Sequence, residues 1–230
     1  MAQSPVDARW PKVLSLAVHE FRTPMTVVAG YIRMLLKDRA GPLTEPQRRL
    51  LEEAEKSCSR LSGLLSEMSD LSGLEAGTAT FNRVPIDIRA ALSESVSALP
   101  EVPDRTIDVD LKVESGPALV QGDPVRLRGA FTAVLMALRR ELVSSTTLAV
   151  RETARQVAGR TVSWIAIADP GQIEPVAKAD DASLAAFDEW RGGSGLSLGV
   201  ARRVFEAHGG GIWSPVADAK AGAVIALPHL

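Results

Sequence analysis

The chain has 230 residues, of which 46% are hydrophobic and 23% are charged, so it can bury substantial cores and is not intrinsically disordered. Its 26 basic and 28 acidic residues give a net charge of -2, which excludes a sustained electrostatic attraction to nucleic acid or an anionic membrane. The single cysteine, Cys58, excludes an internal disulfide, and no apolar run reaches the roughly 18 residues of a membrane span. We therefore expect a cytoplasmic protein, either complete or the soluble end of a longer sensor.

Two long helices are predicted in the first third of the chain. Apolar residues recur at alternating steps of four and three, the spacing of a helix with one buried face, at Leu14, Val18, Phe21, Met25, Val28, Ile32 and Leu35. Gly41, Pro42 and Pro46 interrupt this pattern, which resumes at Leu51, Ala54, Cys58, Leu61, Leu65 and Met68. Because a two-helix hairpin cannot cover its own apolar faces, we expect two chains to pair into a four-helix bundle, which makes the protein a homodimer.

The remainder of the chain predicts a mixed α/β domain. An extended segment and a short helix are expected over residues 81–99, and a longer helix from Asp123 to about Leu142. Another helix is expected from about Gly195 to Ala207, and strands are expected at 107–113, 118–123, 147–152, 161–169, 210–215 and 222–228. The fold class is therefore α+β, with a helical hairpin over residues 1–78 followed by an α/β sandwich over residues 79–230.

His19 poses the main question of the first helix. It follows Val18 of the apolar face and therefore lies at the edge of that face, near solvent. A lone histidine in such a place is most often a boundary residue with a satisfied hydrogen bond. Pro24, however, removes a helical hydrogen bond one turn later at a cost of about 3 kcal/mol, which favours a purpose beyond packing.

The residues H-E-F-R-T-P, at positions 19–24, resemble the phospho-acceptor motif of two-component sensor histidine kinases. In that family a dimeric helical hairpin presents the histidine to a separate ATP-binding domain of α/β sandwich type. The resemblance extends from about residue 12 to 228. It implies that His19 attacks the γ-phosphate of ATP, that Glu20 orients or deprotonates the other imidazole nitrogen, and that Thr23 positions the water that hydrolyses a phosphorylated partner.

The resemblance also implies a set of nucleotide-binding residues. Asp169 and Gly171 match the family's D-x-G box, in which the aspartate accepts a hydrogen bond from the adenine amino group. Gly193 and Gly195 match a glycine-rich run that opens a helix, where backbone amides suit phosphate oxygens. His208 matches the end of that helix, and as a residue before glycines it is expected to be a C-cap without a catalytic role.

Four positions depart from the family's pattern. Two asparagines, one of which holds the magnesium ion that bridges the phosphates, and two glycines are replaced by Ala133, Ala137, Ile173 and Ser197. A methyl group cannot coordinate magnesium, and phosphoryl transfer relies on that ion to neutralise developing charge. We therefore assign no metal ligand in the protein, and we expect ATP and Mg²⁺ to be held weakly and autophosphorylation to be slow.

Two interpretations remain open. In the first, the protein is an ATP-dependent histidine kinase with an unusual site, which is phosphorylated on His19 and exchanges phosphate with a response-regulator receiver domain. In the second, it is a pseudokinase that acts as a histidine phosphotransferase, a response-regulator phosphatase or a scaffold. The receiver would contact Val27, Tyr31 and Met34, whose spacing ordinary packing explains equally well. The motif on the hairpin disfavours a generic ATPase of the same fold and a purely structural protein.

Overall fold

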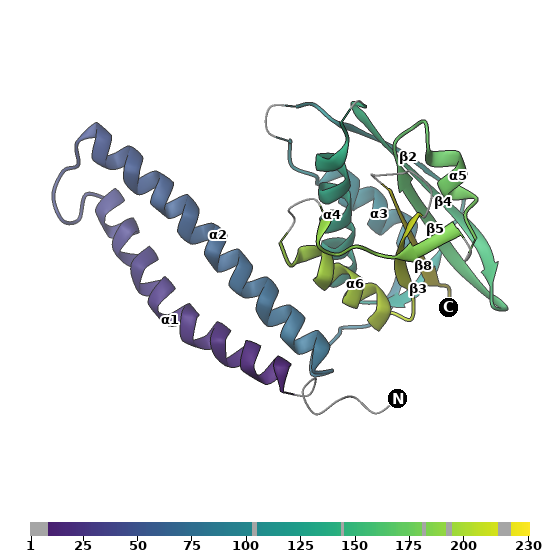
Figure 1. Ribbon diagram of the computed structural model, residues 1–230, viewed down its shortest axis with the longest axis horizontal. Coiled ribbons are helices and arrows are strands. Elements are labelled where there is room, and N and C mark those ends of the chain that lie inside the picture. The colour runs from purple at the N-terminus through teal and green to yellow at the C-terminus, as the bar shows by residue number, and fades with distance from the viewer. Residues whose placement is uncertain (1–8, 103–104, 144, 181–182, 192–194, 216–221) are drawn as a thin grey trace. The chain divides into compact units, whose positions relative to one another are not determined.

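The protein consists of two compact units that divide between Ala79 and Thr80. The structure, a computed structural model, describes residues 9–102, 105–143, 145–180, 183–191, 195–215 and 222–230. The first unit is a helical hairpin and the second combines a sheet with helices (Figure 1). The predicted fold class, a helical hairpin followed by an α/β sandwich, is confirmed.

The hairpin consists of α1 (Trp10–Leu36) and α2 (Glu45–Glu75). Arg48 fixes the connection between them, because it donates to both carboxylate oxygens of Asp38 at 2.9 Å and to the carbonyl oxygen of Leu36 at 2.9 Å. Thr44 and Gln47 form a capping box at the start of α2. Pro46 therefore lies in the first turn of α2, where a missing backbone N–H costs nothing, and it does not interrupt a helix as the sequence pattern indicated.

The hairpin covers only part of the apolar series predicted from the sequence. The residues of that series that it buries are Leu14, Val18, Ile32, Cys58 and Leu65. Phe21 stays 58% exposed, and Val28 and Leu61 each stay 47% exposed. A single hairpin thus leaves apolar side chains of both helices in contact with water, which is unfavourable by roughly 25 cal/mol for each Å² of apolar surface.

A six-stranded sheet forms the centre of the second unit, with the strand order β2-β4-β5-β8-β7-β6. The strands are β2 (Asp108–Val113), β4 (Thr147–Val157), β5 (Arg160–Ala168), β8 (Gly222–Pro228), β7 (Gly211–Pro215) and β6 (Leu184–Ala186). Among the strands that the structure describes in this sheet, β2 and β4 pair in parallel and the other neighbours pair antiparallel. A separate antiparallel pair is formed by β1 (Val84–Asp87) and β3 (Leu119–Gly122).

Helices lie on both faces of the sheet (Figure 1). One face is covered by α3 (Ile88–Ser97), α4 (Pro124–Glu141) and α6 (Ser197–Ala207). The short α5 (Ile173–Ala177) packs against the other face, where its residues Ile173 and Val176 join the buried side chains of Trp164, Ala166 and Ala168. Because β5 is central and covered on both faces, its residues 162–168 are buried without alternation.

Three features of the second unit do not follow from the sequence pattern. The strand expected over 147–152 continues to Val157, because β4 and β5 form a hairpin whose two-residue turn places Ala158 and Gly159 at positive φ of 48° and 78°. Pairing with β5 thus supports a polar stretch that has no strand pattern of its own. Helix α5 and strand β6 were not predicted, since elements this short have no readable period.

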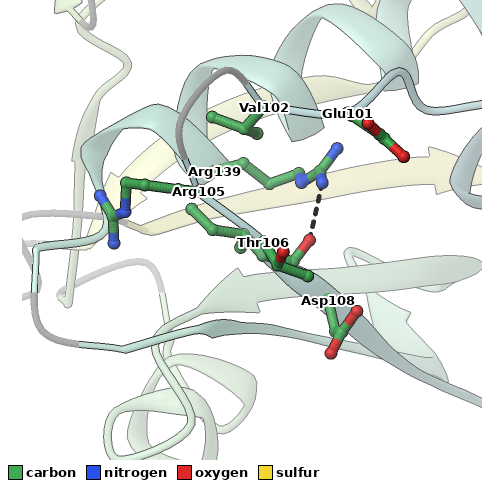
Figure 2. Close-up of a pocket in the computed structure, with 7 residues that line it drawn as sticks. Glu101, Val102, Arg105, Thr106, Asp108 and Arg139 are labelled. Atoms are coloured by element: carbon green, nitrogen blue, oxygen red, sulfur yellow. Dashed lines mark hydrogen bonds between the residues drawn. The ribbon is translucent and has the colours of Figure 1, made fainter.

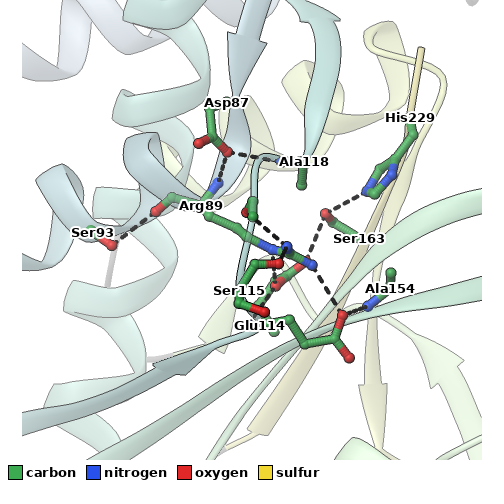
Figure 3. A network of polar contacts seen from close by, with 11 residues as sticks. Asp87, Arg89, Ser93, Glu114, Ser115, Ala118, Ala154, Ser163 and His229 are labelled. Atoms are coloured by element: carbon green, nitrogen blue, oxygen red, sulfur yellow. Dashed lines mark hydrogen bonds and ion pairs between the residues drawn. The ribbon is translucent and has the colours of Figure 1, made fainter.

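A buried ion pair lies between α3 and the sheet (Figure 3). Arg89 Nε donates to Glu152 Oε2 at 2.6 Å, and the side chain of Glu152 is completely buried. The other guanidinium nitrogens donate to the carbonyl oxygens of Ser115 and Gly116 and to Glu114 Oε2. The hydrogen bond from Arg89 to Glu152 is the main reason that the pKa of Arg89 lies above its usual value.

Replacing Arg89 should test how strongly this network stabilises the sandwich. Arg89→Met leaves the Glu152 carboxylate buried without its partner, so the free energy of unfolding should fall by about 3–5 kcal/mol. Arg128→Met is the matched control, because Arg128 pairs with Glu94 on the surface and such pairs contribute about 0–1 kcal/mol. Urea unfolding measures the free energy of unfolding of both variants. Equal losses in the two variants would show that the burial of Glu152 does not raise the cost of removing its partner.

Candidate functional site

His19 and Glu20 lie side by side on the exposed side of α1. The His19 side chain is 77% exposed and the Glu20 side chain 71%, and Nδ1 of His19 lies 3.3 Å from Oε1 of Glu20. An ionised carboxylate can only accept a hydrogen bond, so this contact requires the proton on Nδ1. In the neutral ring Nε2 then carries the free lone pair, and the imidazole is accessible to a reagent from outside the hairpin.

Thr23 lies one helical turn after His19 and is exposed. Residues four positions apart share one face of a helix, so the Thr23 hydroxyl is on the same side of α1 as the imidazole. Pro24 follows it inside the helix, and α1 continues to Leu36. The structure therefore brings the three predicted reaction residues together on one exposed surface of α1.

Asp169 stands at the end of the central strand β5, where the chain turns toward α5. Its Oδ1 accepts a hydrogen bond from the backbone N–H of Gly171 at 2.9 Å, and its carbonyl oxygen accepts one from the N–H of Gln172 at 2.8 Å. Within the part of the chain that the structure describes, Oδ2 accepts no hydrogen bond. The strand end thus holds one carboxylate oxygen in place and leaves the other able to bind a donor such as an amino group.

The glycine-rich run ends at the start of α6. Gly195 has a φ of 64°, in the left-handed region that favours glycine, and Ser197 is the first residue of the helix. Gly193 lies outside the described residues. The backbone amides of the first turn of a helix have no acceptor within that helix, so a helix start of this kind is able to bind an anion.

Helix α4 carries Ala133 and Ala137, the two positions at which the sequence resemblance predicts asparagines. Ala133 is half-buried and Ala137 is buried, and neither methyl group can coordinate a cation. One turn after Ala137, the carboxylate of Glu141 forms an ion pair with Arg191. The sequence analysis missed this pair, which joins residues 50 positions apart, and its only signal was a charged residue at each position.

Asp123 and His208 connect the helices of this unit, and the sequence analysis did not predict their contact. His208 Nε2 accepts the backbone N–H of Asp123 at 2.9 Å, while Nδ1 donates to the carbonyl oxygen of Val204 at 2.6 Å. Burial is the main cause that lowers the pKa of His208 below its usual value. His208 is the C-cap of α6, and hydrogen bonds from Gly209 to Glu206 and from Gly210 to Phe205 complete the helix end.

A pocket of about 430 Å³ lies beside the segment between α3 and β2 (Figure 2). Arg139 of α4 is only 6% exposed and donates to the carbonyl oxygens of Pro100 at 2.8 Å and Ile107 at 2.6 Å. Arg105 likewise donates to the carbonyl oxygen of Leu142. These arginines hold the segment against the end of α4, and the described residues that line the pocket include none of the predicted site residues.

Comparison with known proteins identifies the class. Residues 12–77 match the model of the His Kinase A (phospho-acceptor) domain. The chain is 28% identical over 205 residues to the circadian input-output histidine kinase CikA of Synechococcus elongatus, and this alignment covers 86% of this chain and 27% of CikA. It is also 28% identical over 209 residues to the signal transduction histidine-protein kinase BarA of Escherichia coli K12, and this alignment covers 84% of this chain and 22% of BarA.

Solved structures agree on the fold. Full-length ShkA, crystallised in complex with AMPPNP, superposes with a TM-score of 0.69 at 23% identity, over 95% of this chain and 45% of that one. The histidine kinase AdeS of Acinetobacter baumannii superposes with a TM-score of 0.57 at 20% identity, over 92% of this chain and 98% of that one.

Residues 12–77 thus form a His Kinase A (phospho-acceptor) domain, and most of the chain is similar to sensor histidine kinases of two-component signalling. The chain spans about a quarter of the length of the curated relatives described above. No helix among the described residues is long and apolar enough to cross a membrane.

The neutral state of His208 predicts a pH dependence of stability. The pKa of His208 in the folded chain lies below its usual value of 6.5. As the pH falls below about 6.5, the unfolded chain therefore takes up a proton before the folded chain does, and the stability of the fold decreases. In urea unfolding, His208→Gln should cost about 1–3 kcal/mol at pH 7.5 and should lose less stability than the parent chain on going to pH 5. The control His19→Gln, at an exposed position, should show the same dependence of unfolding free energy on pH as the parent chain. If His208→Gln also shows the parental pH dependence, His208 is not the source of that dependence.

Proposed function

We propose that the hairpin accepts a phosphoryl group on His19 and passes it to the receiver domain of a response regulator. The observation that carries this proposal is the exposed imidazole of His19 with its Nδ1 3.3 Å from the Glu20 carboxylate. Similarity to sensor histidine kinases supplies the reaction class. The activity of the whole protein is part of the proposal, because the chain spans only a fraction of its relatives.

The proposed reaction follows from the tautomer of His19. The Nε2 lone pair attacks the γ-phosphorus of ATP, an N–P bond forms, and the bond to the leaving ADP oxygen breaks. Glu20 stabilises the positive charge that develops on the ring and can accept the Nδ1 proton. In the second step the phosphoryl group moves from Nε2 to a carboxylate oxygen of the receiver's aspartate, and Thr23 positions water for the reverse, hydrolytic function.

The proposed nucleotide site uses Asp169, Gly171 and Gly195, together with Gly193, which lies outside the described residues. The free Oδ2 of Asp169 would accept the hydrogen bond from the adenine amino group, and the start of α6 would bind phosphate. The residues present do not fit Mg²⁺, because Ala133 and Ala137 offer no oxygen and Glu141 is paired with Arg191. We therefore propose that ATP binds weakly and that autophosphorylation is slow.

A second candidate function is that of a pseudokinase which exchanges or removes phosphate through the intact hairpin. The same observations at Ala133, Ala137 and Glu141 favour it, because none of them impairs the chemistry of His19 and Thr23. The two candidates differ in the source of the phosphoryl group, which is ATP in the first and a phosphorylated receiver in the second.

The proposed partners have separate surfaces on the hairpin. A second copy of the chain would cover Phe21, Val28 and Leu61, the part of the predicted apolar series that a single hairpin leaves exposed. A receiver domain would contact Val27, Tyr31 and Met34, which are 50%, 63% and 45% exposed. Exposed apolar and aromatic side chains of this kind are typical of a protein interface.

Incubation with Mg²⁺ and γ-labelled ATP tests the phospho-acceptor function. The label should be acid-labile and base-stable, as for a phosphoramidate, and should be absent from His19→Gln. The label should persist in the control His229→Gln, which changes a histidine of the sandwich.

If ATP gives no label, a labelled phosphorylated receiver domain should transfer its label to His19. Thr23→Ala should slow the hydrolysis of the phosphoryl group on the receiver about tenfold or more. Absence of His19-dependent label from both donors would refute the proposal.

A charged substitution tests the proposed dimer. Light scattering should give the parent chain twice the mass of its 24.5 kDa polypeptide. The double variant Val28→Lys/Leu61→Lys should be monomeric, because it buries two ammonium groups in the proposed apolar interface. Glu52→Lys, at an exposed polar position of α2, is the control and should stay dimeric. A monomeric parent chain, or a dimeric double variant, would contradict this interface.

A further inference from the structure

The Arg191 side chain bridges α4 and β8 in the second unit. Its Nε donates to both carboxylate oxygens of Glu141 at 2.9 and 3.1 Å, and Nη2 also donates to that carboxylate. Nη1 donates to the carbonyl oxygen of Gly222 at 2.9 Å. The side chains of Arg191 and Glu141 are only 11% and 16% exposed, so water screens this ion pair weakly.

Arg191 contacts α4, which carries Ala137, and β8, which pairs with the strand that leads into Asp169. Glu141 is four residues after Ala137 and therefore lies on the same face of α4. Gly222 pairs with Ala168 in the sheet, directly before Asp169. The guanidinium thus joins the α4 face that lacks the magnesium ligand to the strand end that carries the proposed adenine contact.

Arg191 also precedes the proposed phosphate site closely in the sequence. It lies four residues before Gly195, and α6 begins at Ser197. Arginine binds phosphate and carboxylate with the same fork of N–H donors. Glu141 already occupies the Nε and Nη2 donors with which Arg191 could bind a phosphate group.

We propose that the Arg191–Glu141 ion pair is a latch that keeps the nucleotide site in a state of low affinity. When the latch opens, Arg191 supplies a fixed positive charge to the phosphates of ATP, on the side of the site where the asparagine ligands are missing. This inference deepens the proposed function and rests on it, because the site that the latch controls is the proposed nucleotide site.

Glu141→Gln tests the latch. The glutamine keeps the size of the side chain and one acceptor but removes the negative charge that holds Arg191. Isothermal titration with ATP should show affinity higher by about tenfold than in the parent chain, because charge-assisted hydrogen bonds are roughly twice as strong as neutral ones. Adenosine, which has no phosphate, should bind both proteins equally.

Two further variants make the result specific. Adding Arg191→Gln to Glu141→Gln should abolish the gain, because the released guanidinium is its source. Glu94→Gln makes the same chemical change in the exposed pair with Arg128 and should leave ATP affinity unchanged. Thermal unfolding checks that each variant is folded, and Glu141→Ala serves as a second latch variant if Glu141→Gln is not.

The outcomes separate the latch from the proposed function. Equal or weaker ATP binding by Glu141→Gln would overturn the latch, and with His19-dependent label from ATP it would leave the kinase function standing. A gain that survives Arg191→Gln would also overturn it. If no variant binds ATP, both the latch and the nucleotide site fail, while transfer of label from a phosphorylated receiver to His19 would still support the phospho-acceptor function.

Discussion

The arrangement of the sandwich depends on the hydrogen bonds around Asp123. Its carboxylate accepts the backbone N–H groups of Val125 and Arg126, which caps α4, and that of Asn82. Its own N–H donates to His208 at the end of α6. Although burial opposes ionisation, these backbone donors lower the pKa of Asp123 and keep it charged. One residue thus sets where α4 begins relative to α6, the helix that starts directly after the glycine-rich run of the proposed nucleotide site.

The two units obey different constraints. The proposed function requires a nucleotide and a receiver aspartate to reach α1, and His19 is exposed there beside Glu20. The sandwich instead contains two largely buried ion pairs, Arg89 with Glu152 and Arg191 with Glu141. A buried pair contributes little net stability but is costly to break, so it fixes geometry more than it adds free energy. In the sandwich, the Arg89–Glu152 pair therefore holds the fold, and the Arg191–Glu141 pair acts as the proposed latch.

Local sequence determined most of the fold. The apolar periods of α1 and α2 and the alternating strands β2 and β3 are present where the sequence predicts them, because burial on one face imposes the period directly. Helix α5, strand β6 and the second half of β4 were not predictable. Their residues are held by partners from elsewhere in the chain, as in the pairing of Arg155 with Val162 across the β4–β5 hairpin.

The sequence by itself determined the motif at His19, Glu20 and Thr23, because these residues are neighbours along one helix and the four-residue spacing of His19 and Thr23 fixes their common face. It also showed that Ala133 and Ala137 cannot bind a metal, since that depends on residue type alone. Only the tertiary structure decided that Glu141 is paired with Arg191 and that His208 binds the backbone of Asp123. These contacts join positions 50 and 85 residues apart, and the packing of helices on the sheet, which no local pattern records, brings them within hydrogen-bond distance.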